Sequence, residues 1–162
     1  MGHSSSVTGT PPKGLMRALL RMPVWLYRLH LGWMLGSRFV LLNHVGRKSG
    51  KSYQTVVEVV DHDPLSDSTI IASGWGFQSN WYQNLLAHPE LTIQVGRRRL
   101  AVRAEPVPPP EGARILIEYR TKHRIASREL SRMMGLDMAT ATPEQLEEMI
   151  AQSLPMLALR PR

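Results

Sequence analysis

A short basic run, Gly46-Arg47-Lys48-Ser49-Gly50-Lys51-Ser52, has the residue types that bind an anion. It is similar to a P-loop, G-x-x-x-x-G-K-[ST], but it is one residue shorter, and a P-loop is followed at once by a helix. Residues 53–60 are instead rich in β-branched side chains, which favour a strand. The run is therefore not predicted to bind ATP as a Walker loop does.

The same run still suits a phosphate or a carboxylate. Gly46 and Gly50 allow a tight backbone whose N–H groups can point outward. Arg47 and Lys48 bring positive charge, and Ser49 brings a hydroxyl donor. Such a set can hold an anion in a concave nest of amides without a helix dipole. On these residues alone, an ordinary hairpin turn with solvated charges is an equal alternative.

A second cluster, at residues 73–84, combines glycines with aromatic side chains. Gly74 and Gly76 give a flat ligand close access to the backbone, and the indole of Trp75 between them offers a wide apolar face. Trp75 is therefore expected to border a pocket, with core packing as the alternative. Tyr82 is expected to pack in the core.

The sequence contains no arrangement typical of acid–base, nucleophilic or metal catalysis. No pair of carboxylates and no Ser/His/Asp set stands out, so no catalytic residue is predicted. His62 lies between two aspartates, but no further ligand stands at metal-binding spacing, so a solvated turn is expected there and no metal site. The absence of cysteine excludes disulfides and thiolate metal sites and is typical of a reducing cytoplasm.

The net charge of +7 is concentrated in the N-terminal third of the chain. Residues 1–57 carry eight lysines or arginines and no acidic residue, whereas residues 58–162 carry twelve basic and thirteen acidic residues. Such a block indicates an anionic partner: a phosphate-bearing cofactor, an acidic lipid surface or nucleic acid. No nucleic-acid-binding motif accompanies the charge, so no nucleic-acid partner is expected.

One domain is expected to position these residues, because 162 residues match the usual size of a single domain. Residues 1–12 have almost nothing to bury and are predicted to form a disordered leader, which leaves a single domain at residues 13–162.

Residues 13–36 are predicted to form amphipathic helices divided at Pro23, with Arg17, Arg21 and Arg28 on one face. These helices either pack on the domain or lie on anionic lipid at the inner face of the cell membrane. Charges interrupt the apolar stretch too often for a transmembrane span or a secretory signal. A cytoplasmic location is therefore expected.

Short strands with helices gathered at the ends predict an α+β domain built on a barrel or a strongly curled sheet. Strands are expected at residues 38–44, 53–60, 68–73, 91–95, 99–104 and 154–159, with turns at 61–67 and 96–98. Helices are expected at residues 80–87, 111–122, 126–134 and 143–152. The last helix has the sequence of a capping box, with Thr142 before Pro143 and Gln145 placed to close it.

Three motifs in order, GRKSGK, ASGWG and NWYQNLLAHPELTIQVG, resemble the deazaflavin (coenzyme F420)-dependent nitroreductase family. The similarity runs from about residue 38 to about residue 103, and the ending LPMLALRPR is similar to one branch of the family. The resemblance implies a split β-barrel of the FMN-binding split-barrel-like type, with N-terminal and C-terminal helices and often a homodimer. It also implies an F420-dependent oxidoreductase that transfers a hydride from reduced deazaflavin to an organic acceptor such as a quinone or a nitro compound.

The resemblance assigns candidate site residues as well. The basic run matches the family's segment for the cofactor's phosphate and anionic tail, and Trp81 and Asn84 match positions beside the cofactor. The expected cofactor-binding residues are Arg47, Lys48, Ser49, Gly50, Val56, Val57, Ser73, Gly74, Trp75, Gly76, Trp81 and Asn84. Ser73 is also expected on the substrate side, together with Tyr119. The family often carries arginine where Tyr53 stands and proline where Val56 stands, and many members carry lysine where Gly74 stands.

Coenzyme F420 is the expected cofactor, with FMN the less favoured choice. The alternative function is a non-catalytic protein on the same scaffold that binds a lipid, a fatty acid or another flat ligand. The proton for a reduced acceptor could come from Ser73, a tyrosine or solvent, and the sequence leaves this choice open.

Overall fold

The computed structural model describes residues 36–162, except for the side chain of Met133. The expected leader at residues 1–12 and nearly all of the expected amphipathic helices at residues 13–36 lie outside the described residues. Within residues 36–162, no helix is long and apolar enough to cross a bilayer.

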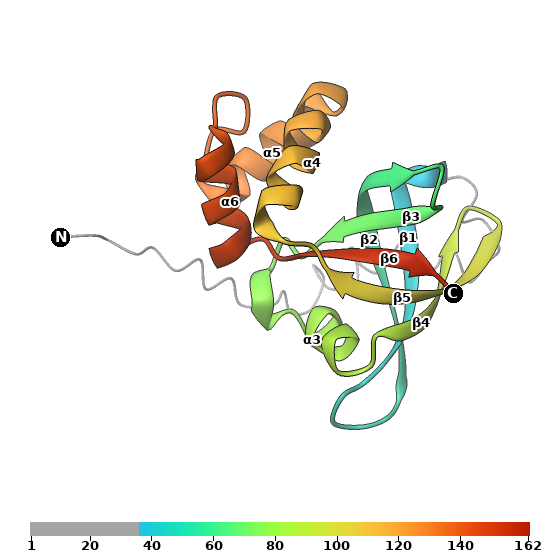
Figure 1. Ribbon diagram of the computed structural model, residues 1–162. Coiled ribbons are helices and arrows are strands. Elements are labelled where there is room, and N and C mark those ends of the chain that lie inside the picture. Colours follow the sequence, from blue (N-terminus) through green and yellow to red (C-terminus); the bar gives the residue numbers. More distant parts are fainter. Residues whose placement is uncertain (1–35) are drawn as a thin grey trace.

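The strands of the described chain form a closed antiparallel barrel in the order β1-β2-β3-β6-β5-β4 (Figure 1). Their bounds are Phe39–Val45 (β1), Ser52–Asp63 (β2), Ser68–Ala72 (β3), Glu90–Val95 (β4), Arg98–Pro106 (β5) and Met156–Pro161 (β6). The C-terminal strand β6 lies between β3 and β5, and β1 closes the barrel by pairing with both β2 and β4. The expected α+β barrel is confirmed.

Helices gather at two separate places on this barrel (Figure 1). The short 3-10 helix η2 (Gly76–Gln78) leads into α3 (Asn80–Ala87), which packs against β1 and β5. The helices α4 (Pro109–Lys122), α5 (Arg124–Met134) and α6 (Pro143–Gln152) lie together at the other end, where α4 contacts α5, α6 and β2. The expected C-terminal helices are therefore present and form one group.

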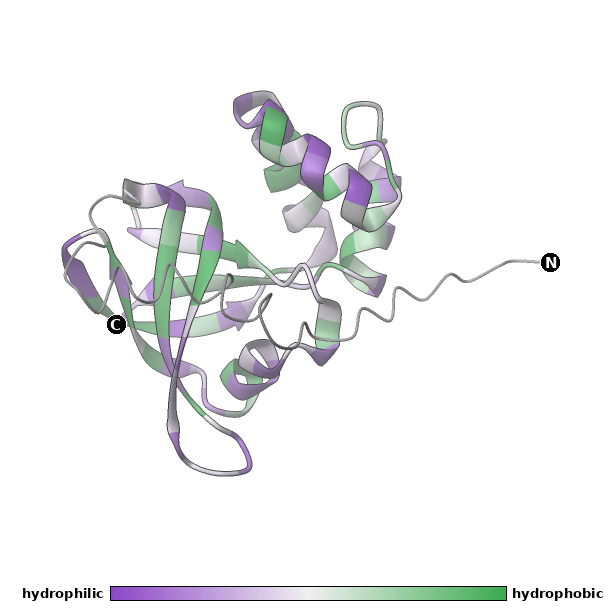
Figure 2. Ribbon diagram, turned by 180° about the vertical axis from the view of Figure 1, so that it is seen from behind, coloured by the Kyte–Doolittle hydropathy of each residue, from purple (hydrophilic) through white to green (hydrophobic). Residues whose placement is uncertain are grey.

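The strand β6 is buried on both faces and so joins two cores. Neighbouring residues of a strand point to opposite faces. Leu157 and Leu159 pack inside the barrel, whereas Met156 and Ala158 pack with the apolar residues of α4 and α6. In Figure 2 hydrophobic colouring follows the strands, and hydrophilic colouring marks the turn between β1 and β2. That turn is thus left free of the core.

The expected elements differ from the observed ones mainly at their ends. α3 and α6 have the expected bounds. β2 continues to Asp63 instead of ending at residue 60, because Asp61, His62 and Asp63 pair with β3 beyond a bulge. The expected turn at residues 61–67 is therefore wrong in its first half. β5 likewise begins at Arg98, which was expected in a turn, because Arg98 pairs with β4.

Thr142→Ala is expected to lower the free energy of unfolding by about 1 kcal/mol, the usual cost of losing a helix N-cap. The Thr142 hydroxyl accepts from the backbone N–H of Gln145 (3.2 Å), and the Gln145 side chain accepts from the backbone N–H of Thr142 (2.9 Å). Urea denaturation measures the change. Thr142→Ser keeps the capping oxygen and serves as the control, so an equal loss in both variants would contradict the capping role.

Candidate functional site

The turn between β1 and β2, residues 46–51, is here called the basic turn. Its backbone is closed by two hydrogen bonds, from Gly46 N–H to the Lys51 carbonyl (2.8 Å) and from Gly50 N–H to the Gly46 carbonyl (2.9 Å). Gly50 has φ +68°, a left-handed conformation that favours glycine. A Cβ at Gly46 would lie 2.6 Å from Ser49 Oγ and 2.7 Å from Tyr53 Cε2. Gly50 therefore suits the backbone of the turn, and a side chain at position 46 would displace Ser49 or Tyr53.

The basic turn is attached to α3 through Arg47. The backbone N–H and the Nη1 of Arg47 both donate to Asn84 Oδ1, at 3.0 and 2.9 Å. The two terminal nitrogens of Arg47 also approach Asn80 Oδ1 at 3.4 Å. The structure thus brings together Arg47 and Asn84, two expected site residues that lie 37 positions apart in the sequence.

A buried histidine continues this network into the barrel. Asn84 Oδ1 accepts from Arg47, so its Nδ2 is left to donate to His44 Nδ1 (3.2 Å). The proton of His44 is then on Nε2, which donates to Thr55 Oγ1 (3.0 Å). Burial lowers the pKa of His44, in agreement with a neutral ring. A single tautomer of His44 therefore supports Asn84 and, through it, Arg47.

Tyr53 packs over this network where the family often carries arginine. Its ring stacks on His44, with centroids 5.9 Å apart and planes 25° apart, and its hydroxyl lies 3.2 Å from Ser49 Oγ. Ser49 Oγ also accepts from the backbone N–H of Lys51 (3.2 Å). Tyr53 therefore contributes packing and a hydroxyl to the basic turn in place of a charge.

Acidification is expected to destabilise the folded protein through His44. Because burial lowers its pKa, the unfolded chain binds this proton more readily than the folded chain does once the pH falls below the ordinary histidine value of about 6.5. The free energy of unfolding should therefore fall as the pH falls from neutral through that value. Urea denaturation at several pH values measures it, with His44→Gln as the comparison. An identical pH dependence in both proteins would contradict the assignment.

The second expected cluster forms a tight turn after β3. Ser73 is 1% exposed, and its hydroxyl donates to the Gly76 carbonyl (2.8 Å) while its backbone N–H donates to the Pro155 carbonyl (2.9 Å). Gly76 has φ +78°. The turn leaves the indole of Trp75 51% exposed, so Trp75 does not pack in the core, and its place beside a pocket stays a prediction. Tyr82 is buried, as expected, and burial raises its pKa.

The remaining expected residues are spread over the neighbouring surface. Trp81 and Gly74 are half-buried, whereas Lys48 and Gly50 are exposed. Val56 and Val57 are adjacent in β2 and half-buried, and Val57 packs against the core of the barrel. Since strand neighbours point to opposite faces, Val56 faces away from that core. The residues of the set are thus not all on one side of β2.

Tyr119 lies away from the basic turn, on the buried side of α4. Its hydroxyl donates to Glu58 Oε1 (3.1 Å), and its ring contacts that of His123. Burial, followed by the Glu58 charge, raises the pKa of Tyr119 far above its ordinary value. Glu58 lies further along β2 than Tyr53 and Val57 do, so β2 connects the basic turn to Tyr119. The substrate role of Tyr119 stays a prediction.

Sequence reasoning did not identify His44 or Thr55 as part of the site. A polar residue at a buried strand position next to a glycine turn is a usable signal for His44. His62, the other histidine considered, is 2.9 Å from Asp67, which also pairs with Arg98 at 2.6 Å. Among residues 36–162 no group of three or more side chains of the metal-ligating types is gathered.

A family model described as F420H(2)-dependent quinone reductase matches residues 19–131. A protein of Mycobacterium tuberculosis that is provisionally named an F420H(2)-dependent quinone reductase is 34% identical over 90 residues, which are 54% of this chain and 74% of that protein.

Solved structures similar to this chain share its fold at low sequence identity. A structure described as a domain-swapped dimer has a TM-score of 0.53 at 16% identity and covers 85% of this chain and 99% of its own. The heme storage protein HutZ from Vibrio cholerae has a TM-score of 0.52 at 9% identity, with 85% and 90% covered. The expected split β-barrel fold is confirmed.

Proposed function

Because the chain belongs to the F420H(2)-dependent quinone reductase family, we propose that its basic turn and α3 hold the anionic tail of coenzyme F420. The chain is an F420-dependent oxidoreductase that reduces a small organic acceptor. When bound, the reduced deazaflavin supplies the hydride. The protein supplies position, electrostatic stabilisation and exclusion of water.

The observation that carries the proposal is the fixed position of Arg47. Its guanidinium and its backbone N–H are both held on Asn84, so the charge is in place before a ligand binds. Lys48 and Lys51 are exposed and have no ion-pair partner among residues 36–162, so they are available to an anion. Phosphate and carboxylate groups fit such a set, because charged donors bind them through short, strong hydrogen bonds.

The acceptor side is proposed to lie near Trp75 and the turn of residues 73–76. The exposed indole offers a flat apolar surface that suits a quinone ring, in keeping with the description of the family. A nitro compound is the other acceptor class inferred from the sequence. The Ser73 hydroxyl donates to the Gly76 carbonyl in this structure. The proton for the reduced acceptor therefore has three candidate sources, which are Ser73, a tyrosine and solvent.

Titration of the full chain with oxidised coenzyme F420, and separately with FMN, tests the cofactor. We expect F420 to bind at micromolar concentration and FMN to bind more weakly. Oxidation of reduced F420 is then followed with menadione and with a nitroaromatic compound as acceptors. If neither F420 nor FMN binds at tens of micromolar, the proposal is overturned. In native mass spectrometry of protein from its own host, a retained acyl chain without deazaflavin would favour the alternative, a non-catalytic binding protein.

Two further proposals concern membrane association and dimerisation. Arg17, Arg21 and Arg28 lie outside the described residues, and their proposed contact is anionic lipid on the cytoplasmic face of the membrane. Flotation with anionic liposomes should fail when all three become glutamate.

A homodimer is proposed from the dimeric structure of similar fold, and light scattering of the purified chain measures its mass.

A further inference from the structure

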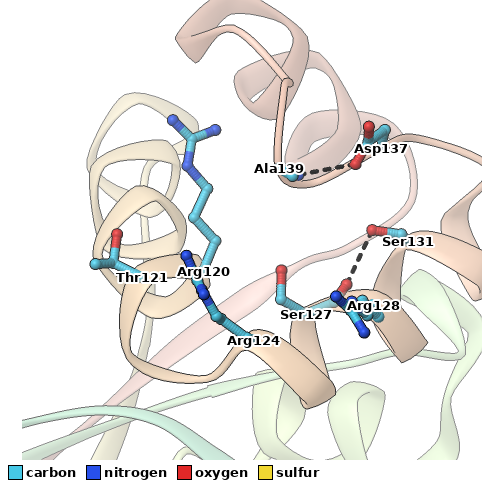
Figure 3. Close-up of a pocket in the computed structure, with 8 residues that line it drawn as sticks. All are labelled: Arg120, Thr121, Arg124, Ser127, Arg128, Ser131, Asp137 and Ala139. Carbon is cyan, nitrogen blue, oxygen red and sulfur yellow. Dashed lines mark hydrogen bonds between the residues drawn. The ribbon is translucent and has the colours of Figure 1, made fainter.

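A hollow of about 560 Å³ lies between α4, α5 and the segment that follows α5 (Figure 3). Its volume is in the range of small-molecule sites, and seven of the eight residues that line it are polar or charged. Three arginines contribute to the lining, Arg120, Arg124 and Arg128, against one carboxylate, Asp137. We propose that this hollow, here called the arginine hollow, binds the phosphate group of a small phosphorylated metabolite.

Two of the three arginines, Arg124 and Arg128, stand at positions of α5 that are electrostatically unfavourable for a cation. Arg124 and Arg128 are exposed, lie one turn apart on α5, and repel each other as like charges at i and i+4. Arg124 is also in the first turn of α5, where the helix dipole disfavours a cation and no acidic residue is present. Neither has an ion-pair partner among residues 36–162. A bound dianion would offset both unfavourable placements.

A hydroxyl group points into the same hollow. Ser127 is only 5% exposed, and it contributes to the lining of the hollow. Figure 3 shows its Oγ directed into the space beside Arg120 and Arg124. A serine hydroxyl can donate to a phosphate oxygen, so Ser127 adds a neutral donor to the charged donors of the arginines.

The other walls of the arginine hollow are held rigidly. Arg120 Nη1 donates to the carbonyls of Met138 (3.1 Å) and Ala141 (2.8 Å). The Ser131 hydroxyl donates to the Ser127 carbonyl (2.9 Å) and accepts from Met138 N–H (3.0 Å). Asp137 accepts from Ala139 N–H (3.0 Å) and from the Thr140 hydroxyl (3.1 Å), so it is engaged in its own turn. These walls are therefore in place before a ligand arrives.

The arginine hollow is separate from the proposed cofactor-tail site. Both Figure 1 and Figure 2 show α4, α5 and α6 at one end of the molecule and the basic turn at the other. The phosphate bound here is thus not the one held by Arg47. This inference adds a second ligand to the proposed function and does not depend on that function.

The experiment titrates glycerol 3-phosphate into the full chain and follows amide shifts by NMR, with glycerol and inorganic phosphate as comparison ligands. We expect shifts confined to α4, α5 and the segment after α5, saturating at millimolar concentration or below, and none with glycerol. If inorganic phosphate saturates the site and glycerol 3-phosphate does not bind, the site takes only the free anion. The proposal of a phosphorylated metabolite is then overturned.

Arg124→Gln and Arg128→Gln are expected to weaken binding at least about tenfold each, as lost charge-assisted bonds do. Ser127→Ala should weaken it severalfold, and Arg114→Gln, which removes an exposed cation from α4 outside the hollow, should leave it unchanged. Arg124→Lys keeps the charge and should lose less affinity than Arg124→Gln. Binding that survives both glutamine variants would overturn the proposal.

Titration of the same variants with coenzyme F420 separates the two sites. Unchanged F420 affinity in Arg124→Gln and Arg128→Gln supports a separate site. Loss of F420 affinity in these variants, or displacement of glycerol 3-phosphate by F420, would assign the arginine hollow to the cofactor and overturn the inference. If F420 fails to bind the unaltered chain while glycerol 3-phosphate binds, the proposed cofactor site fails and this inference stands.

Discussion

Arg47→Ala is expected to weaken the binding of coenzyme F420 by roughly tenfold to a hundredfold, since a hydrogen bond from a charged donor contributes about 1.5–3 kcal/mol and 1.4 kcal/mol is a factor of ten. The effect is expected mostly on affinity, because the guanidinium is held in place before the cofactor binds. Reduction at saturating F420 should therefore change less than binding does. Fluorescence titration and steady-state kinetics measure the two effects separately.

Two further variants separate charge from geometry at this position. Arg47→Lys keeps the charge but cannot reproduce the planar donor that meets Asn84, so an intermediate loss is expected. Arg99→Ala removes an exposed arginine from β5 and should leave F420 affinity within about twofold, because a distant surface charge contributes little. Equal losses in Arg47→Ala and Arg99→Ala would indicate a general charge effect and contradict a specific site at the basic turn.

The sequence predicted the barrel because each of its strands has a local pattern. β-branched residues mark β2, and turn-forming residues separate β1 from β2 and β4 from β5. The bounds of α6 followed from the capping box at Thr142. The end of β2 could not be predicted in the same way, because residues 61–63 are turn formers that pairing with β3 keeps extended. Tertiary pairing outweighed local preference there.

The site was predicted only where its residues are close in sequence or match a family motif. Arg47 and Asn84 were both expected, but not their contact, because 37 residues separate them and one sequence gives no pairing information. His44 was missed for the same reason, since its role depends on Asn84, 40 residues away. The arginine hollow was missed because Arg120 and Arg124 are on different helices, α4 and α5, whose packing brings them to one space.

Asn84→Ala is expected to lower the free energy of unfolding by about 2–4 kcal/mol, since truncation leaves buried donors and acceptors without partners. Asn84 is 5% exposed and joins the Arg47 backbone N–H, the Arg47 guanidinium and His44 Nδ1. The same change should free the basic turn from α3 and reduce F420 affinity as well. Urea denaturation measures the first effect, and F420 titration measures the second.

Asn80→Ala is the matched control, because Asn80 lies one turn earlier on α3, is exposed, and meets Arg47 only at 3.4 Å. We expect it to change the free energy of unfolding by less than about 0.5 kcal/mol, as exposed substitutions usually do. Equal effects of the two variants would contradict the network.

Asn84→Asp tests the direction of each hydrogen bond in the network. Aspartate can still accept from Arg47, but it cannot donate to His44 Nδ1, so the contact is kept only if Nδ1 carries a proton, through a change of tautomer or through protonation of the ring. Because a carboxylate beside the ring favours its charged form, the pKa of His44 should rise from its lowered value, and NMR titration of the ring measures it. The added carboxylate should also weaken F420 binding, because it opposes the charge of Arg47. A variant in which the His44 pKa stays low would contradict the contact between position 84 and His44.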